Sequence, residues 1–394
     1  MHVADKLELL ATGARYDLAC ACGGEQPRVR GRMGRWIYPA VLPDGRRMPL
    51  LKILLSNSCT RSCLYCAQRR GRSFEHVAFR PGELAATFME MHRRGDVSGL
   101  FLSSAIGSRV EDTMEKMLRT VELLRAWHGY TGWLHLKILP GASREQVERA
   151  AVLANRLSLN LEAPTPERLR LISPQKRFFS DIYERIGWVH DLINGGGVRV
   201  RGQTTQFVVG AGDETDGEFI RLAGELYGRL RFSRVYYSAF QPVRDTPLAG
   251  RPPAPFEREH RLYQADFLLR KYGFGAEELV LGDDGNLPPE TDPKTAWAKR
   301  HPESFPVEIN KAPREMLLRV PGIGPVAAGR IIGNRKQEPL KSLDGLRCNG
   351  ALAARAAPFI LLGGKRPEET RGAQLSLLED SWDPNPLHCC KSKR

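Results

Sequence analysis

The sequence predicts an α/β fold, a partial (β/α)6 TIM-like barrel, followed by an all-α C-terminal module. Short apolar runs alternate with helical patterns between residues 49 and 250, and this alternation is typical of parallel strands joined by crossover helices. The segment holds six strand candidates, whereas a complete eight-fold barrel typically needs ~250 residues. A partial barrel therefore fits better, with a doubly wound sheet as the alternative.

The strand candidates are short apolar runs, and the helix candidates carry apolar residues at helical spacing. The strands are predicted around Leu50 (PLLKILLSN) and at Gly99–Leu102, Leu134–Leu139, Leu157–Leu161, Gln206–Val209 and Val235–Phe240. The helices are predicted at Ala4–Leu10, Pro81–Arg94, Val110–His128, Arg144–Leu157, Phe179–Ile193 and Glu257–Tyr272.

Changes in composition divide the chain into five parts. Residues 1–48 are expected to form an N-terminal extension, and residues 49–250 the barrel. Residues 251–304 start with a Pro-rich break and continue as a helical extension and a polar connector. The all-α module is predicted at 305–364, and residues 365–394 are expected to be a flexible tail.

The composition fits a globular protein. The 394 residues are 42% hydrophobic and 26% charged, which excludes wholesale disorder. No run approaches the roughly 18 consecutive apolar residues of a membrane span. Charges interrupt the start of the chain, where a signal peptide needs an apolar block, so we expect a cytoplasmic protein. The net charge of +14 favours a polyanionic partner, although a generally basic proteome would give the same charge.

Three of the eight cysteines are grouped directly after the first predicted barrel strand. Cys59, Cys63 and Cys66 have the spacing Cys-x3-Cys-x2-Cys, whereas zinc sites and ordinary ferredoxin clusters take four protein ligands. A [4Fe–4S] cluster held by three thiolates leaves one iron open to a small molecule. The alternatives are a structural zinc site with a fourth ligand from elsewhere and a chance cluster of cysteines.

This spacing, with Tyr65 before the last cysteine, resembles the radical S-adenosylmethionine (radical SAM) superfamily. The resemblance implies that the three cysteines ligate a [4Fe–4S] cluster whose open iron binds S-adenosyl-L-methionine. In that superfamily an electron from the cluster cleaves S-adenosylmethionine to methionine and a 5′-deoxyadenosyl radical, which abstracts hydrogen from substrate. The cofactor supplies the difficult chemistry, and the protein orients it.

Segments after later strands agree with the superfamily pattern, and the resemblance implies that they contact S-adenosylmethionine. The implied contacts are Tyr65, Ser103, Ser104, Asn160, Glu162, Val209 and Gly210. LFLSSAIG departs from the usual Gly-Gly-Glu segment, because it brings no acid. LSLNLEAPT resembles the Asn-x-Asp/Glu arrangement of biotin synthase, where both side chains would bind the ribose hydroxyls. FVVGAGDET resembles the Gly-rich segment along adenine, and residues 236–248 resemble the sixth-strand segment.

Lys137 lies on the third predicted strand. It either faces the barrel interior, where it would contact substrate or a cofactor phosphate, or extends to solvent.

Residues 306–332 resemble a helix–hairpin–helix motif, in which Pro-Gly-Ile-Gly separates two helical patterns. Glycines let the hairpin backbone approach a surface, and the positive end of the second helix follows. Amides and helix dipole together bind phosphate without distinguishing the bases. We therefore expect Gly322, Gly324, Arg330 and Lys336 to contact a DNA backbone. A hairpin used only for packing is the alternative.

Together the two halves resemble one bacterial family along nearly the whole chain, the DNA modification/repair radical SAM proteins. Members often lie beside a uracil-DNA-glycosylase-like protein. FLSSAIG, LHLKILPGAS and DPKTAWAKRHPESFPVEINKAPREMLLRVPGIG carry this resemblance. It implies a DNA-binding enzyme of DNA repair or DNA modification, with an electron donor such as flavodoxin or ferredoxin. The alternatives are a tRNA- or RNA-modifying radical SAM enzyme and a non-catalytic Fe–S nucleic-acid-binding protein.

The C-terminal tail contains a motif that predicts a second partner. Gln374-Leu375-Ser376-Leu377-Leu378 resembles the bacterial sliding-clamp-binding peptide Gln-Leu-Ser/Asp-Leu-Phe, with Leu378 in place of Phe. It predicts that Gln374, Leu375, Leu377 and Leu378 bind the clamp, although a chance match or a helix end would look similar.

The remaining five cysteines are not expected to bind metal. Cys20, Cys22, Cys389 and Cys390 are expected to be free thiols rather than an auxiliary cluster, and Cys348 a small buried apolar residue.

Overall fold

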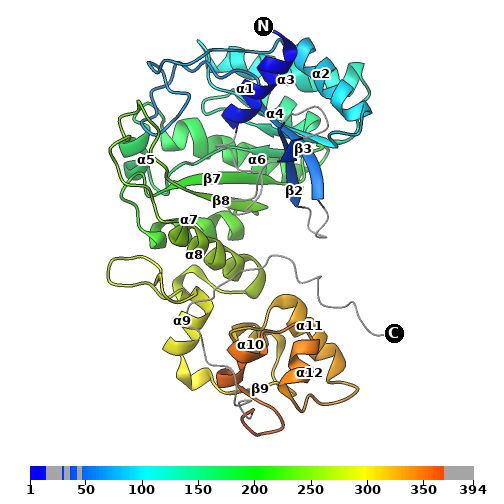
Figure 1. The fold of residues 1–394 in the computed structure, drawn as a ribbon, viewed down its shortest axis with the longest axis vertical. Helices are drawn as coiled ribbons and strands as arrows, with labels where there is room; N and C mark the ends of the chain where they lie inside the picture. The colour runs from blue at the N-terminus through cyan, green and yellow to red at the C-terminus, as the bar shows by residue number, and fades with distance from the viewer. Residues whose placement is uncertain (15–28, 31–35, 42–46, 368–394) are drawn as a thin grey trace. The chain divides into compact units, whose positions relative to one another are not determined.

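The structure is a computed structural model that describes residues 1–14, 29–30, 36–41 and 47–367. The chain divides into two compact units. The first comprises Met1–Asp266 with Asp283–Leu287, and the second comprises Phe267–Gly282 and the chain from Pro288 onward. Figure 1 shows a sheet with surrounding helices in the first unit and short helices in the second. Among the described residues, no helix has the length and apolar character needed to span a membrane.

The first unit is built on one eight-stranded sheet with its strands in chain order. The strands are β1 (Val29–Arg30), β2 (Trp36–Val41), β3 (Arg47–Leu54), β4 (Gly99–Ser103), β5 (Trp133–Lys137), β6 (Arg156–Ser158), β7 (Gln203–Val209) and β8 (Arg234–Ala239). β3 to β8 are parallel, which confirms the six predicted strands of a partial barrel. β2 pairs antiparallel with β3 and β1 with β2, so part of the expected N-terminal extension adds strands to the sheet.

Helices connect the parallel strands. They are α2 (Pro81–Arg93), α3 (Val110–Glu122), α4 (Arg144–Leu153), α5 (Pro166–Ile172), α6 (Glu184–Gly195) and α7 (Asp216–Gly228), while α1 (Val3–Gly13) precedes the sheet and α8 (Phe256–Phe267) follows it. π-helical turns adjoin three of them, at η2 (Leu123–Trp127), η3 (Phe178–Tyr183) and η4 (Leu268–Tyr272).

Two differences from the predicted helices have local causes. The predicted helix Arg144–Leu157 is too long, because Ala154 adopts an extended backbone (φ −98°, ψ 149°) that ends α4 and leads into β6. The sequence analysis missed α5 and α7. α7 starts with a capping box, in which the Thr215 side chain accepts from the Glu218 N–H and the Glu218 side chain accepts from the Thr215 N–H.

The two faces of the sheet differ in character. Phe207 of β7 lies 5.0 Å from Phe219 of α7 between ring centroids, and Tyr237 of β8 lies 6.1 Å from the same ring. Side chains in register with this pair therefore face the helices, and alternate residues face the opposite side. We call that opposite side the inner face. The helix-facing positions of β3 to β5 are apolar and buried, whereas the inner face includes Lys52, His135 and Lys137.

The second unit is made of short elements. They are α9 (Pro293–Arg300), β9 (Val307–Glu308), α10 (Arg314–Arg319), α11 (Pro325–Asn334), α12 (Leu343–Cys348), α13 (Ala353–Ala356) and β10 (Ile360–Leu361). β9 and β10 pair in parallel. The predicted polar connector contains α9, whose first turn is capped by Asp292, which accepts from the Thr295 N–H at 3.2 Å.

The predicted hairpin lies between α10 and α11, and a second hairpin follows between α12 and α13. Gly350 follows Gly322 by 28 positions, and both glycines have φ near +82°. The Leu352 N–H donates to the Gly322 carbonyl at 2.8 Å, and a buried leucine, Leu318 or Leu346, precedes each hairpin. The two hairpins therefore lie side by side and support each other.

Gly322→Ala is expected to destabilise the second unit by roughly 2 kcal/mol or more, because a side chain is strained at positive φ. In addition, an added Cβ would lie only 2.5 Å from the Leu352 carbonyl oxygen. Gly329→Ala is the matched control, since no atom lies within 4 Å of its Cβ position in α11, and it should stabilise by up to about 1 kcal/mol. Urea unfolding checks both changes. Equal effects would contradict the hairpin geometry.

Candidate metal centre

The three clustered cysteines lie in the loop that follows β3, at the carboxyl end of the parallel strands. This loop is fastened to two neighbouring segments by its backbone. The Thr60 N–H donates to the Ile106 carbonyl after β4, and the Leu64 N–H donates to the Ile172 carbonyl at the end of α5, both at 2.8 Å. The Thr60 hydroxyl also donates to the Gly107 carbonyl at 2.6 Å. The loop is therefore held in place without any metal ligand.

Each thiol has a polar neighbour. Cys63 is buried, and its sulfur lies 3.1 Å from the Ser173 hydroxyl. The sulfur of Cys59 accepts from the Arg61 N–H, and that of Cys66 from the Gln68 N–H, both at 3.4 Å. These contacts suit thiolates, since N–H and O–H groups donate to a negative sulfur.

Burial and repulsion from neighbouring thiols oppose ionisation of Cys59 and Cys66. Burial raises the pKa of Cys66 to about 12, with the charge of Cys63 as the next cause. Burial also raises the pKa of Cys59, and the neighbouring Cys63 adds to it. Three thiolates cannot form together here unless a positive centre compensates them, and thiolate is the form that binds metal.

The donor set fits an iron–sulfur cluster. Among the described residues, no three His, Cys, Asp or Glu side chains are placed to share one metal ion. A cubane makes a different demand, because it binds each thiolate through a separate iron. The three soft sulfur donors of one anchored loop, coupled to one another in their ionisation, meet that demand.

A buried ion pair lies beside the thiols. Lys176 Nζ donates to Glu162 Oε1 at 3.0 Å, and the two side chains are 11% and 9% exposed. Burial lowers the pKa of Lys176, but the charges of Glu162, Cys63 and Cys66 outweigh it and raise the pKa above its ordinary value. Burial and the Glu162 carboxylate raise the pKa of Tyr65 well above its usual range. Tyr65, Glu162 and Lys176 therefore form one group next to the cysteine loop.

The backbone of Glu162 explains how its side chain is held. Its φ of 66° is in the left-handed region, which is uncommon for a residue other than glycine. The Glu162 N–H donates to the Gln206 carbonyl at 3.0 Å, and its own carbonyl accepts from the Val208 N–H at 2.8 Å. Strained backbone fixed by neighbouring strands is found most often at functional sites.

The other predicted S-adenosylmethionine contacts lie at the same end of the sheet. Ser103 ends β4 and is buried, and the Ser104 hydroxyl donates to the Ala105 carbonyl at 2.7 Å. Asn160 is buried between β6 and Glu162. Their contacts with S-adenosylmethionine stay predictions. The structure shows that they lie at the ends of β4 and β6, as the resemblance implies.

The backbone N–H and carbonyl of Gly210, one of the two predicted adenine contacts, already make hydrogen bonds within the protein. Its N–H donates to the Glu214 carboxylate, and its carbonyl accepts from Arg251 Nε at 3.0 Å. The Val209 carbonyl accepts from the Phe240 N–H at 2.8 Å. A contact of this segment with a bound adenine would therefore use van der Waals surface rather than these backbone groups.

Sequence reasoning missed Lys176 and Ser173. Both lie after α5 in ISPQK, and no local motif marks that segment. Both residues lie in the segment between β6 and α6. This segment contacts the cysteine loop through the hydrogen bond from the Leu64 N–H to the Ile172 carbonyl. Only the three-dimensional path of the chain reveals this contact.

The remaining predicted residues lie elsewhere. Gly322 and Gly324 form the first hairpin, and Arg330 and Lys336 are exposed in and just after α11. The clamp peptide Gln374–Leu378 lies outside the described residues, as do Cys20, Cys22, Cys389 and Cys390. The expectation for Cys348 is wrong, because its side chain is exposed at the last residue of α12.

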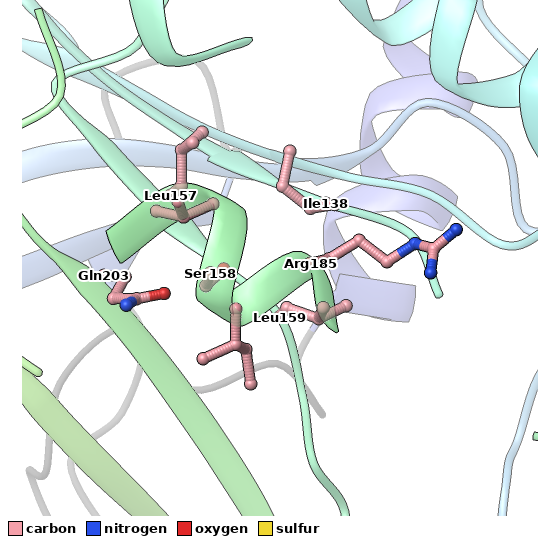
Figure 2. A pocket seen from close by; sticks show the side chains of 8 residues that line it. Ile138, Leu157, Ser158, Leu159, Arg185 and Gln203 are labelled. Atoms are coloured by element: carbon pink, nitrogen blue, oxygen red, sulfur yellow. The ribbon is translucent and has the colours of Figure 1, made fainter. Parts of the chain in front are cut away.

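A small cavity lies on the helix side of the sheet, away from the cysteines. Figure 2 shows Leu157, Leu159 and Ile138 around it, with Arg185 nearby. Its volume of about 10 Å³ suffices for about one water molecule. This cavity has no part in the candidate metal centre.

Residues 53–226 match a protein-family model described as the radical SAM superfamily. The match begins in β3 and ends in α7, so it includes the cysteine loop, Glu162 and Lys176. No curated protein matches the chain.

Solved structures similar to this chain include three that differ in activity. The FeFe-hydrogenase maturase HydG from Carboxydothermus hydrogenoformans is 16% identical over 55% of this chain and 50% of its own, with a TM-score of 0.45. Methylornithine synthase (PylB) is 14% identical over 55% of this chain and 60% of its own, with a TM-score of 0.46. A radical SAM methyltransferase from Sphaerobacter thermophilus is 18% identical over 66% of this chain and 78% of its own, with a TM-score of 0.44. The chain spans about half the length of the maturase.

Cys63→Ala is expected to remove most of the iron and acid-labile sulfide that the chain binds after anaerobic reconstitution, because two thiolates remain where three are needed. Iron and sulfide analysis together with the visible absorption spectrum checks this. Cys348→Ala removes an exposed thiol from the second unit and should leave the iron content unchanged. Undiminished iron in Cys63→Ala would contradict the proposed ligand set.

Glu162→Gln is expected to destabilise the cluster-free protein by roughly 3 kcal/mol, because it leaves the buried Lys176 ammonium without its counter-charge. Glu162→Gln/Lys176→Met should recover much of that loss. The control is Glu115→Gln, which breaks a partly exposed pair with Arg149 at 2.7 Å and should cost less than about 1 kcal/mol. Denaturant unfolding checks all three. An effect of Glu162→Gln as small as that of the control would show that the buried pair is unimportant.

Proposed function

We propose that this chain is a radical SAM enzyme that acts on DNA in modification or repair. The match of residues 53–226 to the radical SAM superfamily model supports the use of a [4Fe–4S] cluster and S-adenosylmethionine. When bound, these cofactors supply a 5′-deoxyadenosyl radical for hydrogen abstraction. Cys59, Cys63 and Cys66 hold the cluster, and Lys176 and Glu162 provide charged groups beside it.

The observation that carries the DNA proposal is the rigid glycine hairpin of the second unit. Gly322 and Gly324 leave the hairpin without side-chain bulk, and α11, ten residues long, starts at Pro325. The positive end of a helix next to a glycine hairpin favours phosphate. Such a contact grips the nucleic-acid backbone and does not depend on base sequence.

Hydrogen bonds from other parts of the second unit hold the hairpin in one conformation. The buried Lys294 Nζ donates to the Ile323 carbonyl at 2.6 Å, and the second hairpin donates to the Gly322 carbonyl. Lys294 is buried, and burial lowers its pKa to about 7. Its amino group therefore contacts the hairpin backbone and not solvent. A hairpin fixed before binding loses less conformational freedom when it meets phosphate.

Basic side chains of the second unit divide into structural and exposed groups. Arg335 donates to the Ile309 and Ala312 carbonyls at 2.8 and 2.7 Å, so it fastens α11 to the preceding segment. Arg330 and Lys336 are exposed. Arg330 Nη1 lies 3.2 Å from the Cβ position of Gly350 in the second hairpin, whereas Lys336 follows the far end of α11. The two side chains add positive charge to the second unit. Residues 305–364 contain nine Lys or Arg and four acidic residues.

RNA modification is the second candidate. A phosphate-binding hairpin does not distinguish deoxyribose from ribose, so the same observation supports a tRNA substrate. We favour DNA because the resemblance along nearly the whole chain is to DNA modification/repair radical SAM proteins. The proposed partners are an electron donor such as flavodoxin or ferredoxin, a uracil-DNA-glycosylase-like protein and, through Gln374–Leu378, the sliding clamp.

The proposal is tested by incubating the anaerobically reconstituted chain with S-adenosylmethionine, a reductant and either duplex DNA, single-stranded DNA or tRNA. Nucleosides released from each are then analysed by mass spectrometry. We expect a change of mass in a DNA nucleoside and 5′-deoxyadenosine formation that increases when DNA is present. A changed nucleoside in tRNA alone would establish the second candidate and overturn the first. No change in either nucleic acid would overturn both.

Arg330→Gln/Lys336→Gln is expected to weaken binding to duplex DNA of any sequence and to reduce its salt dependence. Each phosphate contact contributes about 0.9 to the slope of log K against log salt, so the slope should fall by roughly 1.8. Fluorescence anisotropy over a salt series checks this. Arg119→Gln/Arg144→Gln removes the same charge from α3 and α4 of the first unit and should leave the slope unchanged. Equal losses in the two double variants would contradict a hairpin-centred DNA surface.

A further inference from the structure

The end of α5 and the turn after it hold the cysteine loop on both sides of Cys63. The Leu64 N–H donates to the Ile172 carbonyl at 2.8 Å, and the Ser62 N–H donates to Gln175 Oε1 at 3.2 Å. The first contact fixes the backbone after Cys63, and the second fixes the backbone before it. The position of this cysteine therefore depends on a segment that carries no sequence motif.

Between these two contacts, the Ser173 hydroxyl meets the sulfur of Cys63. The two atoms are 3.1 Å apart, and the exposed fractions of the two residues are only 1% for Ser173 and 8% for Cys63. The Ser173 N–H donates to the Leu169 carbonyl at 2.8 Å, and its carbonyl accepts from the Lys176 N–H at 3.0 Å. Because both backbone groups of Ser173 make hydrogen bonds, the place from which its side chain starts is fixed.

The direction of the hydrogen bond between hydroxyl and sulfur follows from the state of the sulfur. In a free thiol, either the S–H or the O–H group can donate. A cysteine that ligates a metal has lost its proton, so its sulfur can only accept. Among the described residues, the Ser173 hydroxyl has no second hydrogen-bond partner. Since a buried hydroxyl without a partner is costly, this hydroxyl donates to the ligating sulfur.

The other two sulfurs accept from a different kind of donor. Cys59 Sγ accepts from the Arg61 N–H, and Cys66 Sγ accepts from the Gln68 N–H, both at 3.4 Å. These backbone donors belong to the cysteine loop itself. Within the described part of the chain, the Ser173 hydroxyl is the one side-chain donor to any of the three sulfurs, so it is the donor that a substitution can remove.

A hydrogen bond donated to a sulfur ligand acts on the reduction potential of an iron–sulfur cluster. Reduction adds one negative charge, part of which lies on the sulfur ligands, so a donor stabilises the reduced form more than the oxidised form. Burial increases this effect, because the interaction is stronger where water is excluded.

We propose that Ser173 is a positioning residue of the cluster, and that its hydroxyl raises the reduction potential by donating a hydrogen bond to the Cys63 sulfur. This inference rests on the cluster of the proposed function and not on its DNA substrate. The cluster takes up one electron, which comes from the proposed flavodoxin or ferredoxin. A less negative potential makes this transfer more favourable.

The test is a redox titration of the anaerobically reconstituted full chain without S-adenosylmethionine or nucleic acid, in which electron paramagnetic resonance measures the reduced cluster. Ser173→Ala should shift the midpoint to a more negative potential. At the wild-type midpoint, the ratio of reduced to oxidised cluster should fall roughly three- to ten-fold, because the variant loses the difference between two charge-assisted hydrogen bonds. Ser173→Thr keeps the hydroxyl and should keep a midpoint close to that of the wild type.

Two controls separate the hydrogen bond from other causes. Ser158→Ala removes a hydroxyl of β6 that is 7% exposed and has no hydrogen-bond partner among the described residues, and it should leave the midpoint unchanged. Gln175→Ala removes the contact with the Ser62 N–H but no donor to a sulfur, so it should also leave the midpoint unchanged. Iron and sulfide analysis shows which variants retain the cluster. Ser173→Gly lacks the same hydroxyl and supplies the test if Ser173→Ala does not retain iron.

The outcomes distinguish this inference from the proposed function. An unchanged midpoint in the variant without the hydroxyl, or an equal shift in Ser158→Ala, overturns the role of Ser173. A shift in Ser173→Ala that Ser173→Thr does not show supports it. Unchanged nucleosides in DNA and tRNA, together with a midpoint that depends on Ser173, overturn the proposed substrate and leave this inference standing. A wild type that binds no cluster overturns both.

Discussion

The proposed function depends on three thiols in one short loop, of which Cys63 is buried and Cys59 and Cys66 are half-buried. Burial and repulsion from neighbouring thiols raise the pKa of Cys59 and raise that of Cys66 to about 12. The loop is nevertheless held in place by backbone hydrogen bonds to the ends of β4 and α5. A positive cofactor therefore meets sulfur ligands that are already gathered, and its binding supplies the charge that makes them thiolates. The parallel sheet matters because its carboxyl end brings these anchoring segments together.

The sequence predicted most of this framework. Apolar runs located all six parallel strands, because a strand covered by helices must bury its residues. The cysteine spacing predicted three cluster ligands in one loop, and the structure places all three after β3; their role as ligands stays a prediction. The group around Glu162 was only half predicted. Glu162 was found by its resemblance to a strand-end motif, whereas Lys176 follows α5 in a segment without any motif, and topology alone places it beside the thiols.

Other failures have equally specific causes. Cys348 has a small, weakly polar side chain, but it lies on the exposed side of α12. Leu346 supplies the buried contact of that helix instead. The second hairpin escaped notice because its tip, Asn349-Gly350-Ala351-Leu352, lacks the second glycine of Pro-Gly-Ile-Gly. Only its φ near +82° and its contact with Gly322 identify it. Lys137 was assigned to a strand, but its neighbours could not be named without the register across β3 to β6.

The two units provide different kinds of information about a substrate. A hairpin that contacts phosphate through backbone and exposed basic side chains raises affinity for any nucleic acid and does not select among nucleotides. Under the proposed function, selection among nucleotides would come from the first unit, which contains the cysteine loop. Under the proposed function, changes in the hairpin should alter how tightly DNA is held and not which nucleotide is changed.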